Sequence, residues 1–141
     1  MSVATELMQI LLVEDSLADI ELTIDALQGA KVANEVTVIR DGASAMAHLL
    51  DPGEPLPDLV ILDLNLPRKS GLEVLAAMRS NPALKRLPVA VLTTSSAETD
   101  VVRTYDLGAN CFLTKPVNID QFVHVVQSID DFWLGLVRLP T

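Results

Sequence analysis

Short apolar runs alternate with longer amphipathic stretches along this chain, and the alternation limits the possible folds more than any other feature. Five runs have the length of a strand and are rich in Val, Leu and Ile: residues 8–13, 35–40, 58–63, 88–94 and 111–114. The stretches between them have helical periodicity and end at glycine or proline. Strands that alternate with helices form parallel sheets covered on both faces. We therefore predict an α/β fold, (βα)5, with a doubly wound, parallel five-stranded sheet of strand order 2-1-3-4-5.

Capping residues indicate where the helices begin. Five helices are predicted, starting after Ser16, Asp41, Gly71, Ser95 and Asn118. Side chains such as Ser, Asp and Asn accept hydrogen bonds from the free amides of a first helical turn. Asn118 and Gln121 are expected to cap the last helix together.

Polar side chains follow four of the apolar runs at the point where each strand should end. In an open parallel sheet, ligands bind beyond the carboxyl ends of the strands, where the strand order reverses. With the order 2-1-3-4-5 this reversal falls between the first and third strands. We therefore expect one crevice to collect five side chains: Glu14, Asp15, Asp63, Thr93 and Lys115.

The three carboxylates of this crevice require a neutralising partner. Two such charges about 4 Å apart repel by roughly 4 kcal/mol at an effective dielectric constant near 20. Either one of them is protonated or a cation lies among them, and oxygen ligands favour a hard ion such as Mg²⁺. Mg²⁺ on one side and Lys115 on the other would hold the oxygens of a transferring phosphoryl group. Asp63 lies centrally and is the candidate nucleophile, which would form an acyl phosphate.

The stretches that carry these side chains resemble the receiver domains of two-component response regulators. The matching segments are residues 11–16, 60–71, 89–94 and 111–116. The spacing also fits the family, because Thr93 lies 30 residues after Asp63 and Lys115 lies 52 residues after it. The resemblance covers nearly the whole chain.

The resemblance implies a role for each matching position. Asp63 would be the phosphoacceptor and a metal ligand, with Glu14 and Asp15 as the acidic pair beside it. Asp15 would bind the metal directly, whereas the extra methylene of Glu14 favours binding through water. The remaining roles are the metal-binding backbone carbonyl of Asn65, the switch hydroxyl of Thr93, the switch aromatic Phe112, the phosphate contact of Lys115, and Pro116 after a cis peptide bond.

The function implied is signalling rather than catalysis of a metabolic reaction. The chain would be a stand-alone response regulator that accepts a phosphoryl group from a sensor histidine kinase and assists its own phosphorylation and dephosphorylation. Residues 14–22 and 128–140 look like those of regulators associated with cyanobacterial and bacterial phytochromes, so a phytochrome is the expected kinase. The signal would pass to a downstream protein by direct interaction.

Two other functions remain open at this level. A Mg²⁺-dependent phosphohydrolase with an aspartyl-phosphate intermediate would want a second acid two residues after Asp63, where this chain has Asn65. A flavodoxin-like cofactor carrier would want a loop rich in Ser, Thr and Gly after the first strand. Residues 14–19 read EDSLAD instead, and their charges would repel a cofactor phosphate.

Charge and cysteine content limit the possible binding partners and the cellular compartment of the chain. The net charge of -9 argues against binding to nucleic acid or to anionic membranes. No apolar run is long enough to span a bilayer, and the first residues lack the features of a secretion signal. The lone Cys111 has no partner for an internal disulfide, which fits a reducing compartment. The expected location is the cytoplasm.

The end of the chain is more apolar than one domain requires. On a helical wheel, Ile119, Phe122 and Val123 belong to a stripe that faces the core. Further apolar residues widen that stripe, and we expect them to form a homodimer interface: Val125, Phe132, Trp133, Leu134 and Leu136. The expected organisation is a receiver domain over residues 1–133 and an apolar dimerisation extension over residues 134–141.

Overall fold

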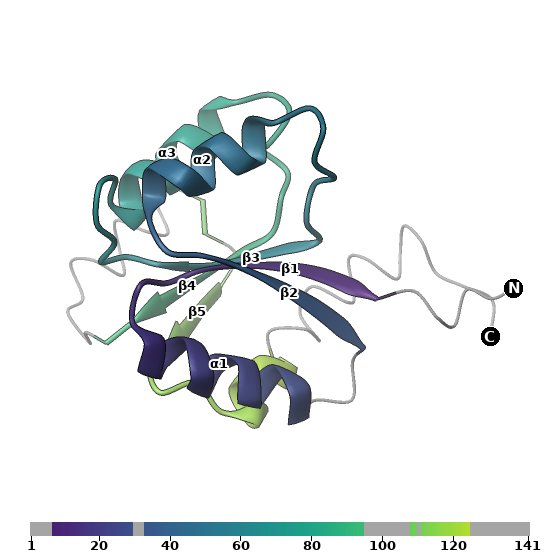
Figure 1. Ribbon diagram of the computed structural model, residues 1–141, viewed down its shortest axis with the longest axis vertical. Coiled ribbons are helices and arrows are strands. Elements are labelled where there is room, and N and C mark those ends of the chain that lie inside the picture. Colours follow the sequence, from purple (N-terminus) through teal and green to yellow (C-terminus); the bar gives the residue numbers. More distant parts are fainter. Residues whose placement is uncertain (1–6, 30–32, 95–107, 110, 125–141) are drawn as a thin grey trace, which may run out of the picture.

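The computed structural model describes residues 7–29, 33–94, 108–109 and 111–124, and these residues form the predicted parallel sheet. Its five strands lie in the order β2-β1-β3-β4-β5, and each neighbouring pair is parallel, which confirms the predicted topology (Figure 1). The strands are β1 (Met8–Val13), β2 (Asn34–Ile39), β3 (Leu59–Asp63), β4 (Val89–Thr93) and β5 (Cys111–Thr114).

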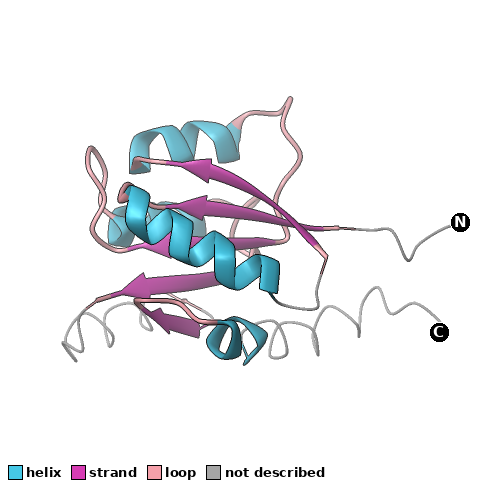
Figure 2. Ribbon diagram, turned by 60° about the horizontal axis from the view of Figure 1, so that its bottom comes forward, coloured by secondary structure: helices cyan, strands magenta, loops and turns pink. Residues whose placement is uncertain are grey.

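Helices cover both faces of the sheet, as expected for a doubly wound fold. Helix α1 (Leu17–Gly29) packs on one face, while α2 (Gly42–Leu50) and α3 (Gly71–Ser80) pack on the other (Figures 1 and 2). Residues 119–124 are helical and lie on the same face as α1. The helix predicted after Ser95 lies outside the described residues. Within the described residues, no helix is long and apolar enough to span a membrane.

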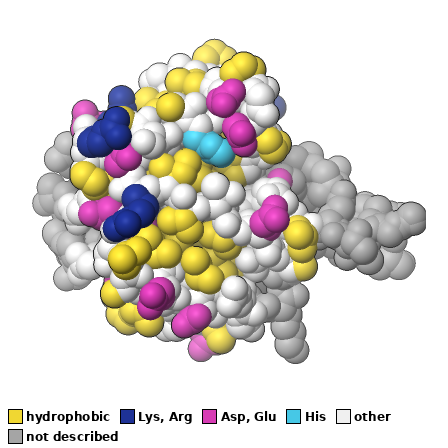
Figure 3. Space-filling view, viewed as in Figure 1, with side chains coloured by type: hydrophobic (Ala, Val, Ile, Leu, Met, Phe, Trp, Pro, Cys, Tyr) yellow, Lys and Arg dark blue, Asp and Glu magenta, His cyan; other side chains and the backbone are white. Residues whose placement is uncertain are grey.

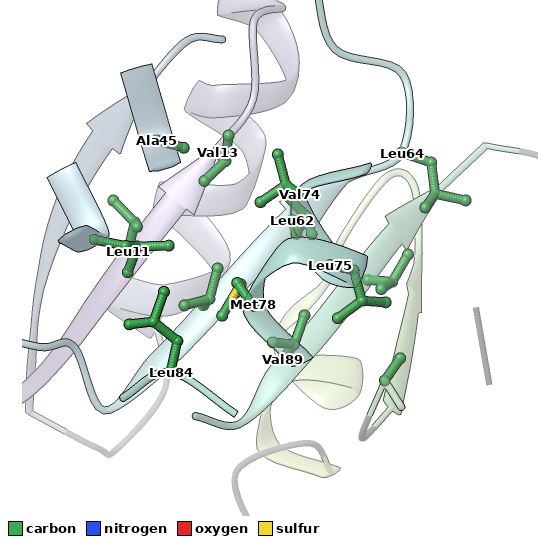
Figure 4. Close-up of a cluster of buried hydrophobic side chains, with 14 residues drawn as sticks. Leu11, Val13, Ala45, Leu62, Leu64, Val74, Leu75, Met78, Leu84 and Val89 are labelled. Atoms are coloured by element: carbon green, nitrogen blue, oxygen red, sulfur yellow. The ribbon is translucent and has the colours of Figure 1, made fainter. Parts of the chain in front are cut away.

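The sheet separates two hydrophobic clusters, because successive residues of a strand face opposite sides. Leu11, Val13 and Leu62 pack beneath α2 and α3 with the apolar residues of those helices (Figure 4). On the other face, Phe122 is completely buried against α1 and the central strands. All residues of β3 and β4 are buried, as expected for central parallel strands.

The helix that starts near residue 119 packs differently from the prediction. Phe122 enters the core as expected, but Ile119 is 44% exposed and lies beside Gly29 at the end of α1. Asn118 caps this helix by accepting the Gln121 N–H at 2.8 Å, as predicted. The Gln121 side chain does not join that cap. Its oxygen accepts the Thr114 N–H at 2.9 Å, and this contact ties the helix to β5.

The parallel register brings the strand ends level with one another. Val13 lies opposite Leu62, Asp63 opposite Leu92, and Thr93 opposite Thr114. The ladder also continues past the strands, because the Lys115 N–H donates to the Thr93 carbonyl oxygen at 3.0 Å. The residues that follow β1, β3, β4 and β5 therefore meet at one edge of the sheet. Figure 3, in the orientation of Figure 1, shows acidic and basic side chains side by side at the end of the molecule toward which the strand arrows point.

Candidate functional site

Three carboxylates meet at the carboxyl ends of β1 and β3, as the sequence predicted. One oxygen from each of Glu14, Asp15 and Asp63 lies within 4.8 Å of the other two. Glu14 and Asp63 are buried, and Asp15 is half-buried. Such a set of oxygen ligands is the type that Mg²⁺ or Mn²⁺ takes in proteins.

Lys115 enters this carboxylate group from the end of β5. Its Nζ atom lies 2.7 Å from Glu14 Oε2 and 3.1 Å from Asp63 Oδ2, and the lysine side chain is only 10% exposed. The bond to Asp63 has hydrogen-bond geometry, whereas the closer approach to Glu14 is an ion-pair contact without it. The phosphate-contacting role expected of Lys115 is therefore supported by its position against the expected acceptor carboxylate.

The charges of the pocket act on one another through a water-poor environment. Burial raises the pKa of Glu14, and the nearby Asp63 raises it further, although Lys115 and the Ser16 N–H act in the opposite direction. Burial alone would lower the pKa of Lys115. The surrounding Glu14, Asp19 and Asp63 outweigh that effect and raise the lysine pKa, so Lys115 is cationic throughout the physiological range.

Glu14 has one carboxylate oxygen that is hydrogen-bonded and one that makes only an ion-pair contact. Its Oε1 atom accepts the Ser16 N–H at 3.0 Å. Its Oε2 atom is buried and receives no hydrogen bond within the described part of the chain. A buried carboxylate oxygen without a donor is costly unless a cation approaches it, and the Lys115 Nζ atom lies 2.7 Å from this one. The three clustered carboxylates carry more negative charge than Lys115 alone neutralises, and they fit a divalent cation held by Glu14, Asp15 and Asp63.

The loop after β3 holds Asp63 in place. The Asn65 N–H donates to Asp63 Oδ1 at 3.1 Å, a contact that the sequence analysis did not foresee because it considered only the Asn65 carbonyl. Gly71 begins α3 directly behind the acceptor. A Cβ atom at Gly71 would lie 2.1 Å from the Asp63 carbonyl oxygen, so only glycine fits there without a shift of the backbone. The Gly71 N–H also donates to the Leu64 carbonyl oxygen at 3.0 Å, closing the loop.

The two expected switch residues lie on the neighbouring strands β4 and β5. Thr93 ends β4 and is 5% exposed. Phe112 is half-buried in β5 and packs against the cluster beneath α2 and α3. The peptide bond between Lys115 and Pro116 is cis, as the resemblance implied. The expected dimer residues Val125, Phe132, Trp133, Leu134 and Leu136 lie outside the described residues.

Asp19 also reaches the site, although the sequence analysis did not single it out. Its Oδ2 atom accepts a hydrogen bond from Lys115 Nζ at 3.1 Å, from a position in the first turn of α1. An acid in a first helical turn is ordinarily explained by the helix dipole, so its residue type alone gave no signal of this contact.

The pocket thus combines a buried carboxylate, a lysine within hydrogen-bond distance of it and a group of carboxylate oxygens that could hold a cation. Those are the parts that phosphoryl transfer to a carboxylate requires. Comparison with known proteins agrees with this chemistry. Residues 10–127 match the family model described as the response regulator receiver domain.

Similar individual proteins belong to the same group. The response regulator Rcp1 of Synechocystis sp. is 50% identical over 135 residues, which cover 93% of this chain and 92% of Rcp1. A crystal structure of the Mn²⁺-bound form of Rcp1 matches with a TM-score of 0.73 and 49% identity, over 94% of this chain and 99% of that one. The phosphorylated cyanobacterial phytochrome response regulator RcpA matches with a TM-score of 0.75 and 48% identity, over 96% of this chain and all of that one.

The family match rules out the flavodoxin-like and phosphohydrolase alternatives. The acidic loop after β1 and the lysine after β5 agree with that match. Receiver domains are phosphorylated on an aspartate and bind Mg²⁺ or Mn²⁺ in an acidic pocket, and the pocket described above has that composition. This chain belongs to the receiver domain family of two-component response regulators.

Proposed function

We propose that this chain accepts a phosphoryl group on Asp63 from the phosphohistidine of a sensor histidine kinase of the phytochrome type. The observation that carries the proposal is the contact between Lys115 Nζ and Asp63 Oδ2, 3.1 Å long, in a pocket that also contains the cation ligands. The phytochrome link rests on the similarity to RcpA, which is a phytochrome response regulator.

The reaction is an in-line displacement at phosphorus. An oxygen of the Asp63 carboxylate forms the new bond to phosphorus as the bond from the histidine nitrogen breaks, and the imidazole leaves with the electron pair and takes up a proton. Lys115 neutralises charge on the phosphoryl oxygens from one side. The Asn65 N–H holds the carboxylate in position through its contact with Oδ1.

Glu14, Asp15 and Asp63 would hold the divalent cation, with the Asn65 carbonyl as a further ligand. When bound, the cation neutralises the phosphoryl oxygens that face away from Lys115. The place of Glu14 in this set is supported by its oxygen, which lies within 4.8 Å of an oxygen of Asp15 and of Asp63. Its buried position beside Lys115 also agrees with binding through water.

Thr93 and Phe112 would transmit the change to the surface. In this proposal the Thr93 hydroxyl turns toward a phosphoryl oxygen, and Phe112 turns into the space that Thr93 leaves. Phe112 has no hydroxyl, so its inward position leaves no polar group unsatisfied. The altered surface would then be read by a downstream protein.

The rest of the chain would support this role. Residues 1–133 would form the receiver domain, and residues 134–141 would extend a homodimer interface built on Val125, Phe132, Trp133, Leu134 and Leu136. A homodimer buries the same apolar patch from both copies. The unpaired Cys111 suits the reducing cytoplasm, where we place the protein.

A labelling experiment tests the proposal. The protein is incubated with a phosphorylated histidine kinase, and the phosphorylated residue is identified by mass spectrometry. Asp63→Asn and removal of divalent cations with a chelator should each abolish labelling. Asp51→Asn, which changes an exposed acid after α2, should be labelled like the wild type. Full labelling of Asp63→Asn would show that the acceptor is wrong.

A further inference from the structure

Asp19 occupies a helix position whose side chain usually accepts a hydrogen bond from the capping residue, but that N–H group already donates to another side chain. Ser16 caps α1, and its Oγ atom accepts the Asp19 N–H at 3.3 Å. An acid three residues after such a cap commonly returns the contact by accepting the N–H of the capping residue. Here the Ser16 N–H donates to Glu14 Oε1 instead. The Asp19 carboxylate is therefore left to contact another group.

That group is Lys115, 96 residues later in the chain. Asp19 Oδ2 and Asp63 Oδ2 each lie 3.1 Å from Lys115 Nζ, and no more than twice that distance from each other. Both contacts have hydrogen-bond geometry. The ammonium group that should contact the phosphoryl group is thus shared with a carboxylate on α1.

Asp19 differs from the other carboxylates around this lysine in its exposure. Its side chain is 28% exposed, whereas those of Glu14 and Asp63 are 0% and 3% exposed. Asp19 therefore lies on the solvent side of Lys115. An anionic phosphodonor that reaches Asp63 from solvent meets this negative charge close to the reacting group.

We propose that Asp19 is a positioning residue that competes with the phosphoryl group for Lys115 and thereby restrains phosphorylation of Asp63. The inference rests on the proposed function, in which Asp63 is the acceptor. In the unphosphorylated protein Asp19 holds part of the lysine charge. As the phosphoryl group arrives, Lys115 turns from Asp19 toward the phosphoryl oxygens.

The substitution Asp19→Asn separates charge from shape. Asn keeps the size of the side chain and an oxygen that accepts a hydrogen bond, but it removes the negative charge. The lost repulsion should raise the rate of phosphorylation about three- to tenfold, because the site is only partly screened by solvent. The same loss of charge should weaken Mg²⁺ binding by a similar factor. A residue that merely capped α1 would change neither quantity.

The experiment uses acetyl phosphate as the donor at saturating Mg²⁺. The bond between phosphorus and the Asp63 oxygen forms, the bond between phosphorus and the acetate oxygen breaks, and acetate leaves with the electron pair. Phosphorylation rates are measured by mass spectrometry, and Mg²⁺ dissociation constants by calorimetry. Glu21→Gln is the matched control, because it removes the same charge from an exposed position of the same helix.

The expected result is faster phosphorylation and weaker Mg²⁺ binding for Asp19→Asn, with Glu21→Gln close to the wild type. Equal rates and equal Mg²⁺ affinities for Asp19→Asn and the wild type would overturn the inference. Slower phosphorylation of Asp19→Asn would overturn it as well, because Asp19 would then assist Lys115 rather than compete for it. A wild-type protein that takes no label on Asp63 would overturn the proposed function, and this inference with it.

Discussion

Replacement of Gly71 by alanine should damage the phosphoacceptor site more than it damages the fold. The added Cβ atom would lie 2.1 Å from the Asp63 carbonyl oxygen and 2.7 Å from the Leu64 Cα atom. Ordinary contact begins at 3.4 Å, so the Asp63 carbonyl oxygen has to move away by more than 1 Å and the Leu64 Cα atom by about 0.7 Å. Both are backbone atoms, which leaves no flexible side chain to absorb the shift.

Two effects of different size follow from that shift. Overpacking of a buried site costs about 1–3 kcal/mol of stability, which leaves most of the protein folded. A displacement of about 1 Å at a reacting group costs about a hundredfold in rate. Gly71→Ala should therefore unfold at somewhat lower urea concentration but accept phosphate from acetyl phosphate far more slowly.

Gly53→Ala is the matched control. Gly53 lies in the exposed loop after α2, and its added Cβ atom would meet only the Asp51 side chain, at 3.3 Å. The free energy of unfolding should change by less than about 0.5 kcal/mol, and the phosphorylation rate should stay the same. If Gly71→Ala phosphorylates as fast as Gly53→Ala, the close approach of α3 to the acceptor does not constrain Asp63.

Three further predictions concern groups outside the phosphorylation pocket. Burial raises the pKa of the Cys111 thiol to about 11, which leaves little of the reactive thiolate at neutral pH. Iodoacetamide at pH 7.5 should therefore alkylate Cys111 about two orders of magnitude more slowly in the folded protein than in the urea-unfolded chain. Equal alkylation rates would contradict this burial. The Ser44 N–H and hydroxyl lower the pKa of Asp41, so the ionised Asp41 stabilises the folded protein. The difference in stability between the wild type and Asp41→Ala should be complete above about pH 4 and should disappear as the pH falls through the lowered pKa. Thermal unfolding at a series of pH values measures this difference. The Arg79 side chain donates hydrogen bonds to the carbonyl oxygens of Lys85, Leu87 and Gly108. Arg79→Met should therefore lower the free energy of unfolding in urea by about 1–2 kcal/mol. An unchanged urea midpoint would refute a structural role for Arg79.

The fold was predictable because its pattern is repeated along the chain. Each buried strand is an apolar run, and each run stops at the polar residue that follows the strand. The errors lie at element ends, where single side chains decide. Residue 58 was assigned to the third strand, but the Asp58 carboxylate accepts the Gln9 N–H at 2.8 Å and β3 starts one residue later. Helix α3 starts at Gly71 rather than Leu72, because Ser70 and Glu73 cap each other.

The candidate site was predictable to the extent that its residues follow strands. Asp63 and Thr93 end their strands, Glu14, Asp15 and Lys115 come directly after theirs, and the topology alone brings the five together. Asp19 does not follow a strand, and its contact with Lys115 depends on where the Ser16 N–H is directed. No local sequence pattern predicts the contact between Asp19 and Lys115. It requires Glu14 to accept the Ser16 N–H, and it requires Lys115, which is distant in the sequence.

The parallel sheet also determines when during synthesis the chain becomes able to receive a signal. Parallel strands never pair through a tight hairpin, and Ile10 of β1 pairs with Leu59 of β3 across 48 intervening residues. Such long-range closure is slow. Asp63, the proposed acceptor, is synthesised 52 residues before Lys115. If Asp63 is the acceptor and Lys115 its phosphate contact, the complete site exists only once β5 has been made and paired, and a kinase that needs both residues would act only on the folded domain.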